Sequence, residues 1–172
     1  MFGSIARRYD LLNHVLSLNL DRAWRRRAAR ALPEDPSARV LDLCGGTGDL
    51  TVALVRAGRA GTVVCCDFSH PMLLLALPKF ARMKAAARCL PLEADGHRLP
   101  LPSCSFDAVT VAFGVRNLTD MDAAFREILR LLKPSGRLVV LEFSTPTMPI
   151  LFSIYRFYLT RVLPLLGDAV TG

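Results

Sequence analysis

The sequence predicts an α/β protein with a doubly wound, Rossmann-like parallel sheet, and two observations lead to this prediction. Five short apolar runs of the kind that form buried strands alternate with segments of helical periodicity. The first apolar run leads directly into a glycine-rich turn, Cys44-Gly45-Gly46-Thr47-Gly48, and then into a helical segment. Strands that alternate with helices are typical of parallel sheets covered by helices on both faces.

The expected elements follow one another without an internal repeat. A basic amphipathic helix over about residues 17–32 comes first, and Pro33-Glu34-Asp35-Pro36 ends it. Lys133-Pro134-Ser135-Gly136 is expected to stop the last helix and turn into the last strand. Strands are expected at 39–43, 62–67, 89–93, 106–113 and 136–143, and further helices at 50–57, 71–87 and 121–132.

The chain is basic, with 22 Lys and Arg against 15 Asp and Glu, a net charge of +7 and a pI near 9.6. Phosphate backbones and anionic lipid headgroups attract such a surface equally well, so charge alone does not choose between them or exclude a solvated helix face. The five cysteines form no C-x-x-C pair and are expected to be small buried hydrophobic residues. Together with the absence of a signal-peptide pattern, they favour the reducing cytoplasm.

The glycine-rich turn is the first candidate ligand site. The dinucleotide fingerprint G-x-G-x-x-G fails here, because Thr51 stands where the third glycine or alanine belongs. The turn instead resembles the acidic-x-G-x-G-x-G loop of S-adenosylmethionine-dependent class I methyltransferases. Asp42, Gly46 and Gly48 are in register, Cys44 replaces the first glycine, and Gly45 is expected to compensate. The alternative is a tight β-to-α turn that binds nothing.

Two carboxylates are expected at the ends of the next strands. Asp67 ends the second strand, 19 residues after Gly48, where a carboxylate can accept hydrogen bonds from both ribose hydroxyls. The alternative is a helix N-cap, since Ser69 and Pro71 also suit a helix start. Asp95-Gly96 follows the third strand and would contact an adenine edge; an ordinary Asp-Gly turn is the alternative.

The fourth strand leads into Ala112-Phe113-Gly114-Val115-Arg116-Asn117, which places two strong hydrogen-bonding side chains near the expected reacting centre. The chain lacks the Asn/Asp-Pro-Pro-aromatic segment that amino-methyltransferases carry here, so N-methylation of adenine or cytosine is disfavoured. Alternatively, Arg116 and Asn117 cap the following turn and pair with Asp120 or Asp122.

Taken together, these segments resemble the ubiquinone/menaquinone biosynthesis C-methyltransferase family, with further matches at 1–13, 21–25 and 131–144. The resemblance implies methyl transfer from S-adenosylmethionine, with S-adenosylhomocysteine as product, to a ring carbon of a reduced prenylated quinone such as demethylmenaquinol or the equivalent ubiquinone precursor. It also implies cofactor contacts. These are expected at Asp42, Gly45, Gly46, Thr47, Gly48, Asp67, Asp95 and Gly96, and near Ala112, where some relatives have serine.

For catalysis, the resemblance implies that Arg116 stabilises the developing phenolate and that Asn117 holds the ring. Tyr9, Asp10 or His14 on the leader would relay the proton. No metal is expected. The runner-up functions are methylation of another small phenol or of RNA, and a non-catalytic methyltransferase-fold partner.

We expect a single domain over residues 1–172: a helical leader at 1–36, a cofactor-binding core at 37–145 and an apolar helix at 146–172. The family is expected to continue past Gly172 with further sheet strands, so the fifth strand would be open and a homodimer is one way to cover it. The apolar stretch 150–159 suits an interfacial helix, with core packing as the alternative. Peripheral contact with anionic lipid at the inner face of the membrane is expected, and no nucleic acid.

Overall fold

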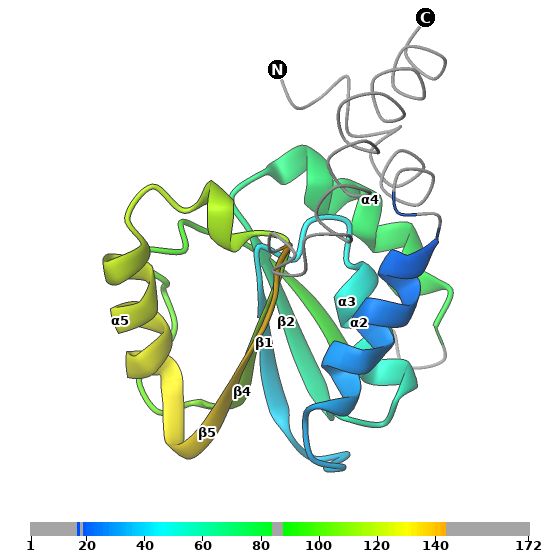
Figure 1. Cartoon of the computed structure of the whole chain (residues 1–172), viewed down its shortest axis with the longest axis horizontal. Helices are drawn as coiled ribbons and strands as arrows, with labels where there is room; N and C mark the ends of the chain where they lie inside the picture. Colours follow the sequence, from blue (N-terminus) through cyan, green and yellow to red (C-terminus); the bar gives the residue numbers. More distant parts are fainter. Residues whose placement is uncertain (1–16, 18, 84–87, 144–172) are drawn as a thin grey trace, which may run out of the picture.

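The computed structural model describes residues 17, 19–83 and 88–143 and contains one five-stranded parallel sheet (Figure 1). The strand order is β3-β2-β1-β4-β5. The chain winds outward from β1 in one direction and then returns to wind in the other, so the predicted doubly wound sheet is confirmed. The strands are β1 (Arg39–Leu43), β2 (Thr62–Asp67), β3 (Cys89–Glu93), β4 (Phe106–Ala112) and β5 (Leu132–Leu141).

Helices cover both faces of this sheet. The helices α2 (Leu20–Arg30), α3 (Asp49–Arg56) and α4 (His70–Ala81) lie on one side, and α5 (Met121–Leu131) lies on the other (Figure 1). A short 3-10 turn, η2 (Val115–Asn117), precedes α5. The predicted leader residues 1–16 and the predicted helix at 146–172 lie outside the described residues.

The core follows from the alternation of side chains along the strands. Leu41 and Leu43 pack with Ile128 of α5, whereas Val40, one residue away, packs with Leu54 of α3. All five are essentially buried, and each such side chain contributes roughly 1.5–3 kcal/mol to stability. Because both faces are covered, the central strands have to be apolar on both sides, as the sequence predicts.

Several predicted boundaries were wrong by a few residues. α2 is shorter than the predicted 17–32, and α4 ends at Ala81, before the predicted end at 87. β4 ends at Ala112, one residue early, because Phe113 has a φ of 57° and leaves the extended conformation. α5 ends at Leu131, one residue before the prediction.

The last strand differs most from its prediction. β5 begins at Leu132 instead of 136, because Leu132 already pairs with Phe106. Pairing resumes with Arg137 opposite Ala108, so residues 133–136 bulge out of the ladder opposite a single residue, Asp107. The expected turn is therefore present, but it interrupts the strand and does not precede it.

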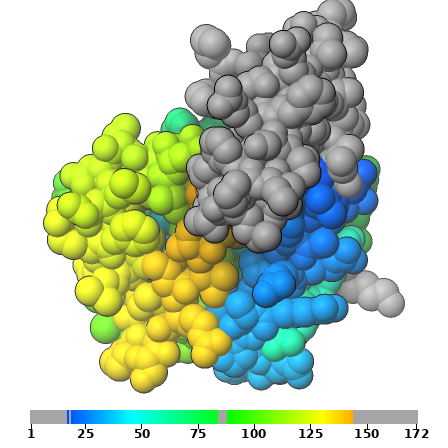
Figure 2. Space-filling view, in the orientation of Figure 1, coloured from blue at the N-terminus to red at the C-terminus, as the bar shows by residue number. Residues whose placement is uncertain are grey.

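The helix α2 lies beside β5 on one face of the molecule (Figure 2). A hydrogen bond from Arg137 Nη1 to the carbonyl oxygen of Ala31, at 2.6 Å, ties the two together. Within the described part of the chain, β5 pairs only with β4 and is an edge strand, as predicted. Among the same residues, no helix combines the length and the apolar character needed to cross a bilayer.

Candidate functional site

The glycine-rich loop, residues 44–48, leaves β1 at the carboxyl edge of the sheet. Gly46 and Gly48 have positive φ values of 55° and 78°, which glycine adopts without penalty. Cys44 has a φ of 54°, so the position where the motif lacks its glycine still has the left-handed conformation, at a cost of about 1–2 kcal/mol. The loop is held by hydrogen bonds from Gly45 N to Cys66 O and from Gly48 N to Gly45 O, both 2.9 Å.

Two of these glycines are required by close packing. A Cβ on Gly45 would lie 2.6 Å from Cys65 Sγ, so this residue lets the loop approach β2. A Cβ on Gly48 would lie 2.6 Å from the Phe80 ring of α4. The loop therefore sits close to β2 and α4, a position open only to residues without a side chain.

Asp42 lies beneath the loop and is fully buried. Its two carboxylate oxygens accept hydrogen bonds from the hydroxyls of Thr51, at 2.7 Å, and Thr110, at 2.9 Å. Burial raises the pKa of Asp42 to about 6, although both hydroxyls lower it. Sequence reasoning found the carboxylate but missed the threonines, whose only signal is a hydroxyl inside otherwise apolar runs.

Asp67 connects the end of β2 to the loop. Its Oδ2 accepts from Gly46 N at 2.8 Å and its Oδ1 accepts from Ser69 N at 2.9 Å. Burial raises the pKa of this carboxyl group, and these backbone hydrogen bonds oppose the shift. Each oxygen keeps a further lone pair, so the carboxylate has capacity for two hydroxyl groups as well as for holding the start of α4.

Asp95 and Gly96 follow β3, and His97 holds them in place. The Oδ1 of Asp95, an exposed side chain, accepts from His97 N at 3.0 Å and from His97 Nδ1 at 2.5 Å. His97 Nε2 accepts from the backbone N–H of Asp120 at 3.2 Å, which assigns the ring proton to Nδ1. Sequence reasoning missed His97, which links this loop to the start of α5.

Thr47, also predicted as a cofactor residue, is buried in the glycine-rich loop, two residues before α3 begins. Lys79 of α4 donates to Thr47 Oγ1 at 3.0 Å and to Asp49 Oδ1 at 2.6 Å. Lys79 was not predicted, because nothing local in the sequence relates it to a loop about 30 residues away.

The turn that carries Arg116 and Asn117 packs against the glycine-rich loop. A Cβ on Gly114 would lie 2.3 Å from Cys44 Cβ, so the two loops touch. Both Arg116 and Asn117 are exposed on η2. Ala112, at the end of β4, lines a small cavity beside the loop together with Asp42 and Gly46.

The partner of Arg116 is Glu142, at 2.5 Å between Arg116 Nη1 and Glu142 Oε1. The proposed pairing with Asp120 or Asp122 was therefore wrong for Arg116. Asp120 instead caps α5 by accepting from Ala123 N at 2.9 Å. Glu142 was missed because it follows the neighbouring strand, and only sheet pairing brings the two residues together.

An aromatic cluster of Trp24, Phe113 and Phe143 stands next to this turn. The rings of Phe113 and Phe143 are stacked with centroids 4.7 Å apart, and Trp24 of α2 meets both rings edge-on. The guanidinium of Arg25 lies 5.4 Å from the Phe113 ring centroid. A positive φ is rare for so bulky a residue as Phe113, and residues in such strained conformations cluster at functional sites as well as in tight turns.

The remaining predicted catalytic residues, Tyr9, Asp10 and His14, lie outside the described residues. In the described part of the chain no three His, Cys, Asp or Glu residues cluster as metal ligands. The cavity beside the loop has a volume of about 40 Å³, room for about one water. A cavity of this size does not hold a nucleoside, and Asp67 and Asp95 lie outside it, at the end of β2 and after the end of β3.

A doubly wound sheet with a glycine-rich loop after β1 and an acid at the end of β2 is the arrangement of Rossmann-like nucleotide-binding folds, to which the class I methyltransferases belong. A solved structure from Methanococcus maripaludis, described as an S-adenosyl-L-methionine-dependent methyltransferase, shares this fold. It superposes with a TM-score of 0.73 at 20% identity, over 99% of this chain and 77% of its own.

The model of the ubiE/COQ5 methyltransferase family matches residues 1–172, and the chain belongs to this family. It is therefore a methyltransferase whose cofactor is S-adenosylmethionine, as the resemblance implied. The Demethylmenaquinone methyltransferase of Thermus thermophilus is 49% identical over 100% of this chain and 77% of its own length. A Ubiquinone/menaquinone biosynthesis C-methyltransferase UbiE from Geobacter sulfurreducens is 44% identical over 97% of this chain and 66% of its own length.

Proposed function

We propose that this chain methylates a ring carbon of a reduced prenylated quinone, demethylmenaquinol or the corresponding ubiquinone precursor, in respiratory quinone biosynthesis. The names of the relatives support this substrate class, since one refers to demethylmenaquinone and the other to both ubiquinone and menaquinone. The observation that carries the proposal is the contact of Gly114 with Cys44, because it joins the turn bearing Arg116 to the glycine-rich loop.

The cofactor would be held by three groups at the carboxyl edge of the sheet. Asp67 would accept the ribose hydroxyls, and Asp95 with the backbone of Gly96 would contact the adenine. The glycine-rich loop with Thr47 and Asp42 would hold the methionine end, near Ala112. When bound, S-adenosylmethionine would supply an electrophilic methyl group and leave as S-adenosylhomocysteine, whose sulfur keeps the electron pair of the broken S–CH3 bond. The protein therefore mainly has to orient and desolvate the reactants.

Arg116 would stabilise the developing charge on the substrate. As the new carbon–carbon bond forms, the adjacent hydroxyl must lose its proton or share it, and a guanidinium stabilises that oxygen. Arg116 is not the base, because guanidinium stays protonated in proteins. The ring carbon loses its hydrogen as a proton when aromaticity returns, and the hydroxyl is restored. Asn117 would hold the ring, and Tyr9 is a candidate for the proton relay.

Glu142 would orient Arg116 for this role. Its Oε1 accepts from Arg116, while its buried Oε2 has no hydrogen-bond partner among the described residues. A buried oxygen without a partner is costly, and a substrate hydroxyl could satisfy it. The guanidinium of Arg116 also lies 5.7 Å from the Phe143 ring centroid, which restricts its position further.

We further propose peripheral contact with the inner face of the membrane, since a prenylated quinone dissolves in the bilayer. The high positive charge of the chain supports contact with anionic lipid. A homodimer that covers β5 remains a prediction, and sedimentation equilibrium would test it.

Isothermal titration calorimetry with S-adenosylhomocysteine tests the cofactor site. Asp67→Asn should weaken binding by 10-fold to 100-fold, as expected when a charged acceptor is lost. Asp107→Asn is the matched control, since Asp107 stands at the start of β4, paired with Lys133 and remote from the loop. Equal affinity for the wild type and Asp67→Asn would refute the ribose assignment.

Methyl transfer to detergent-dispersed demethylmenaquinol tests the reaction. Arg116→Gln should lower kcat by about 10²-fold, the usual effect of removing one group that stabilises transition-state charge, and leave S-adenosylhomocysteine affinity unchanged. Glu142→Gln should lower kcat less. The exposed Arg126→Gln on α5 is the control. If folded wild type binds the cofactor but methylates no quinol, the substrate assignment fails.

A further inference from the structure

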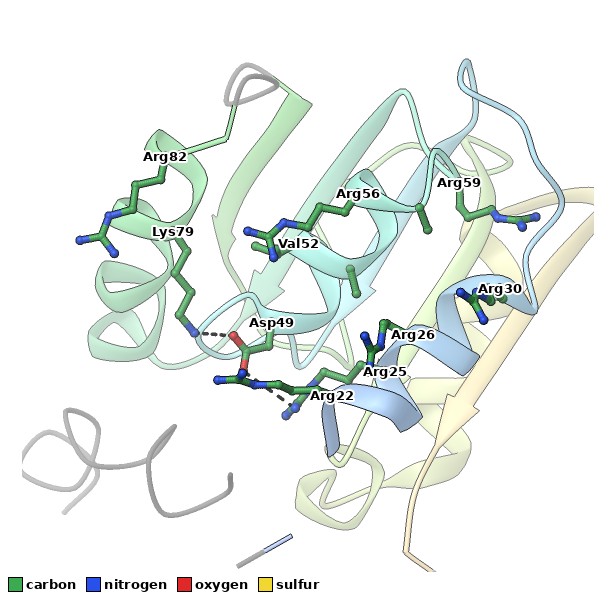
Figure 3. Close-up of a pocket in the computed structure, with 12 residues that line it drawn as sticks. Arg22, Arg25, Arg26, Arg30, Asp49, Val52, Arg56, Arg59, Lys79 and Arg82 are labelled. Atoms are coloured by element: carbon green, nitrogen blue, oxygen red, sulfur yellow. Dashed lines mark hydrogen bonds and ion pairs between the residues drawn. The ribbon is translucent and has the colours of Figure 1, made fainter. Parts of the chain in front are cut away.

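A groove of about 740 Å³ lies between α2, α3 and α4, and we call it the basic groove (Figure 3). Its lining combines seven arginines and one lysine with a single carboxylate and three small apolar residues. They are Arg22, Arg25, Arg26, Arg30, Arg56, Arg59, Arg82, Lys79, Asp49, Val52, Ala53 and Ala57. Neither the cofactor nor the quinol ring accounts for so much positive charge.

Three of these cations already have carboxylate partners. Arg59 pairs with Glu34 at 2.7 Å, Lys79 pairs with Asp49 at 2.6 Å, and Arg25 pairs with Asp21. The other five are exposed, and none has a carboxylate partner within the described ranges: Arg22, Arg26, Arg30, Arg56 and Arg82. Like charges gathered in this way repel one another unless an anion lies among them.

These five arginines come from α2, from α3 and from the C-terminal end of α4. Arg22, Arg26 and Arg30 are spaced four residues apart and form one stripe that spans about 12 Å of α2. Figure 3 shows Arg56 reaching from α3, and Arg82 at the C-terminal end of α4. Guanidinium groups bind phosphate oxygens in a bidentate manner. A row of this length suits a ligand with more than one phosphate better than a single small anion.

The other lining residues favour a lipid headgroup over a single-stranded nucleic acid. Val52 and Ala53 of α3, with Ala57 just after the helix, place an apolar surface between the charged groups, which suits the hydrocarbon part of a phospholipid next to its headgroup. Among the described residues that line the groove none is aromatic, whereas single-stranded nucleic acids bind by stacking on aromatic rings. Arg25 and Asp49 line both the groove and the small cavity at the glycine-rich loop, so a bound headgroup would lie beside the active site.

We propose that the basic groove binds the headgroup of an anionic phospholipid, preferably one with two phosphates such as cardiolipin. This inference rests on the proposed function, because a bilayer-dissolved substrate makes lipid the available source of phosphate. Headgroup binding holds the cofactor loop at the membrane surface, where the prenylated quinol is presented.

Flotation of the full chain with lipid vesicles tests this proposal. Wild type should float with vesicles that contain cardiolipin, less with phosphatidylglycerol at equal total charge, and not with neutral phosphatidylcholine. Arg26→Gln/Arg30→Gln should partition roughly thirtyfold more weakly, given the usual contribution of each basic residue near an anionic surface. Arg98→Gln/Arg126→Gln removes the same charge outside the groove and should float as wild type does. Arg56→Gln alone, on the opposite wall, provides a second test with less risk to folding.

Three results would overturn the proposal. The first is that both double variants weaken vesicle binding equally, and the second is that Arg26→Gln/Arg30→Gln and Arg56→Gln float as well as wild type does. The third is that the chain binds RNA and that cardiolipin vesicles do not displace the RNA. A thermal midpoint that rises with pyrophosphate but not with cardiolipin vesicles would assign the groove to a soluble phosphate. Both double variants should keep wild-type affinity for S-adenosylhomocysteine and wild-type methylation of detergent-dispersed quinol. These measurements separate failure of the groove from failure of the proposed reaction.

Discussion

Replacement of Gly48 by alanine separates the two reasons why the loop needs glycine. The substitution forces a φ of 78° on alanine, which costs about 1–2 kcal/mol. It also places a Cβ 2.6 Å from the Phe80 ring, and such overpacking costs about 1–3 kcal/mol more. We therefore expect Gly48→Ala to lower the free energy of unfolding by about 2–5 kcal/mol.

Gly58→Ala is the matched control, because Gly58 also has a positive φ, 67°, but nothing lies within 4 Å of its added Cβ. It should cost only the conformational part, about 1–2 kcal/mol. Urea unfolding followed by circular dichroism measures both values. Phe80→Leu in the Gly48→Ala background should recover part of the loss. Equal destabilisation by the two glycine replacements would refute the packing argument.

Two further predictions follow from buried ionisable groups. The pKa of Asp42 is raised from 3.8 to about 6, so the folded state binds more protons than the unfolded state between these values and stability falls as pH rises through this range. The stability of Asp42→Asn relative to wild type should therefore increase by about 2 kcal/mol between pH 4 and pH 7, measured by urea unfolding, whereas a difference that stays constant with pH would contradict the raised pKa. Burial raises the pKa of Cys66 to about 12 and Cys65 is fully buried, whereas Cys104 is exposed. One thiol per chain should thus react rapidly with Ellman's reagent, and Cys104→Ser should abolish that fast phase; two or more fast thiols would be inconsistent with this packing.

Among the five cysteines the prediction of small buried residues holds for Cys65, Cys66 and Cys89 only. Cys44 is half-buried, and Cys104 is exposed in the turn before β4. All five are free thiols. Apolar neighbours in the sequence indicate burial inside a strand, but they do not say which side of a connecting turn meets solvent.

The sequence by itself determined the strands and the loop. Val40, Leu41 and Leu43 lie in a run that is apolar on both faces, which only a covered parallel sheet can bury. Gly46 and Gly48 were identified correctly as the turn, because backbone conformation at a glycine is a local property.

Only the tertiary structure decided which side chains meet. Arg116 and Glu142 are 26 residues apart, and the register of β4 against β5 brings them together. The aromatic contacts of Trp24 with Phe113 and the convergence of arginines in the basic groove depend in the same way on how α2 packs. Periodicity along a chain encodes which face of an element is buried, whereas the partner across an interface follows from packing between elements that the local pattern does not specify.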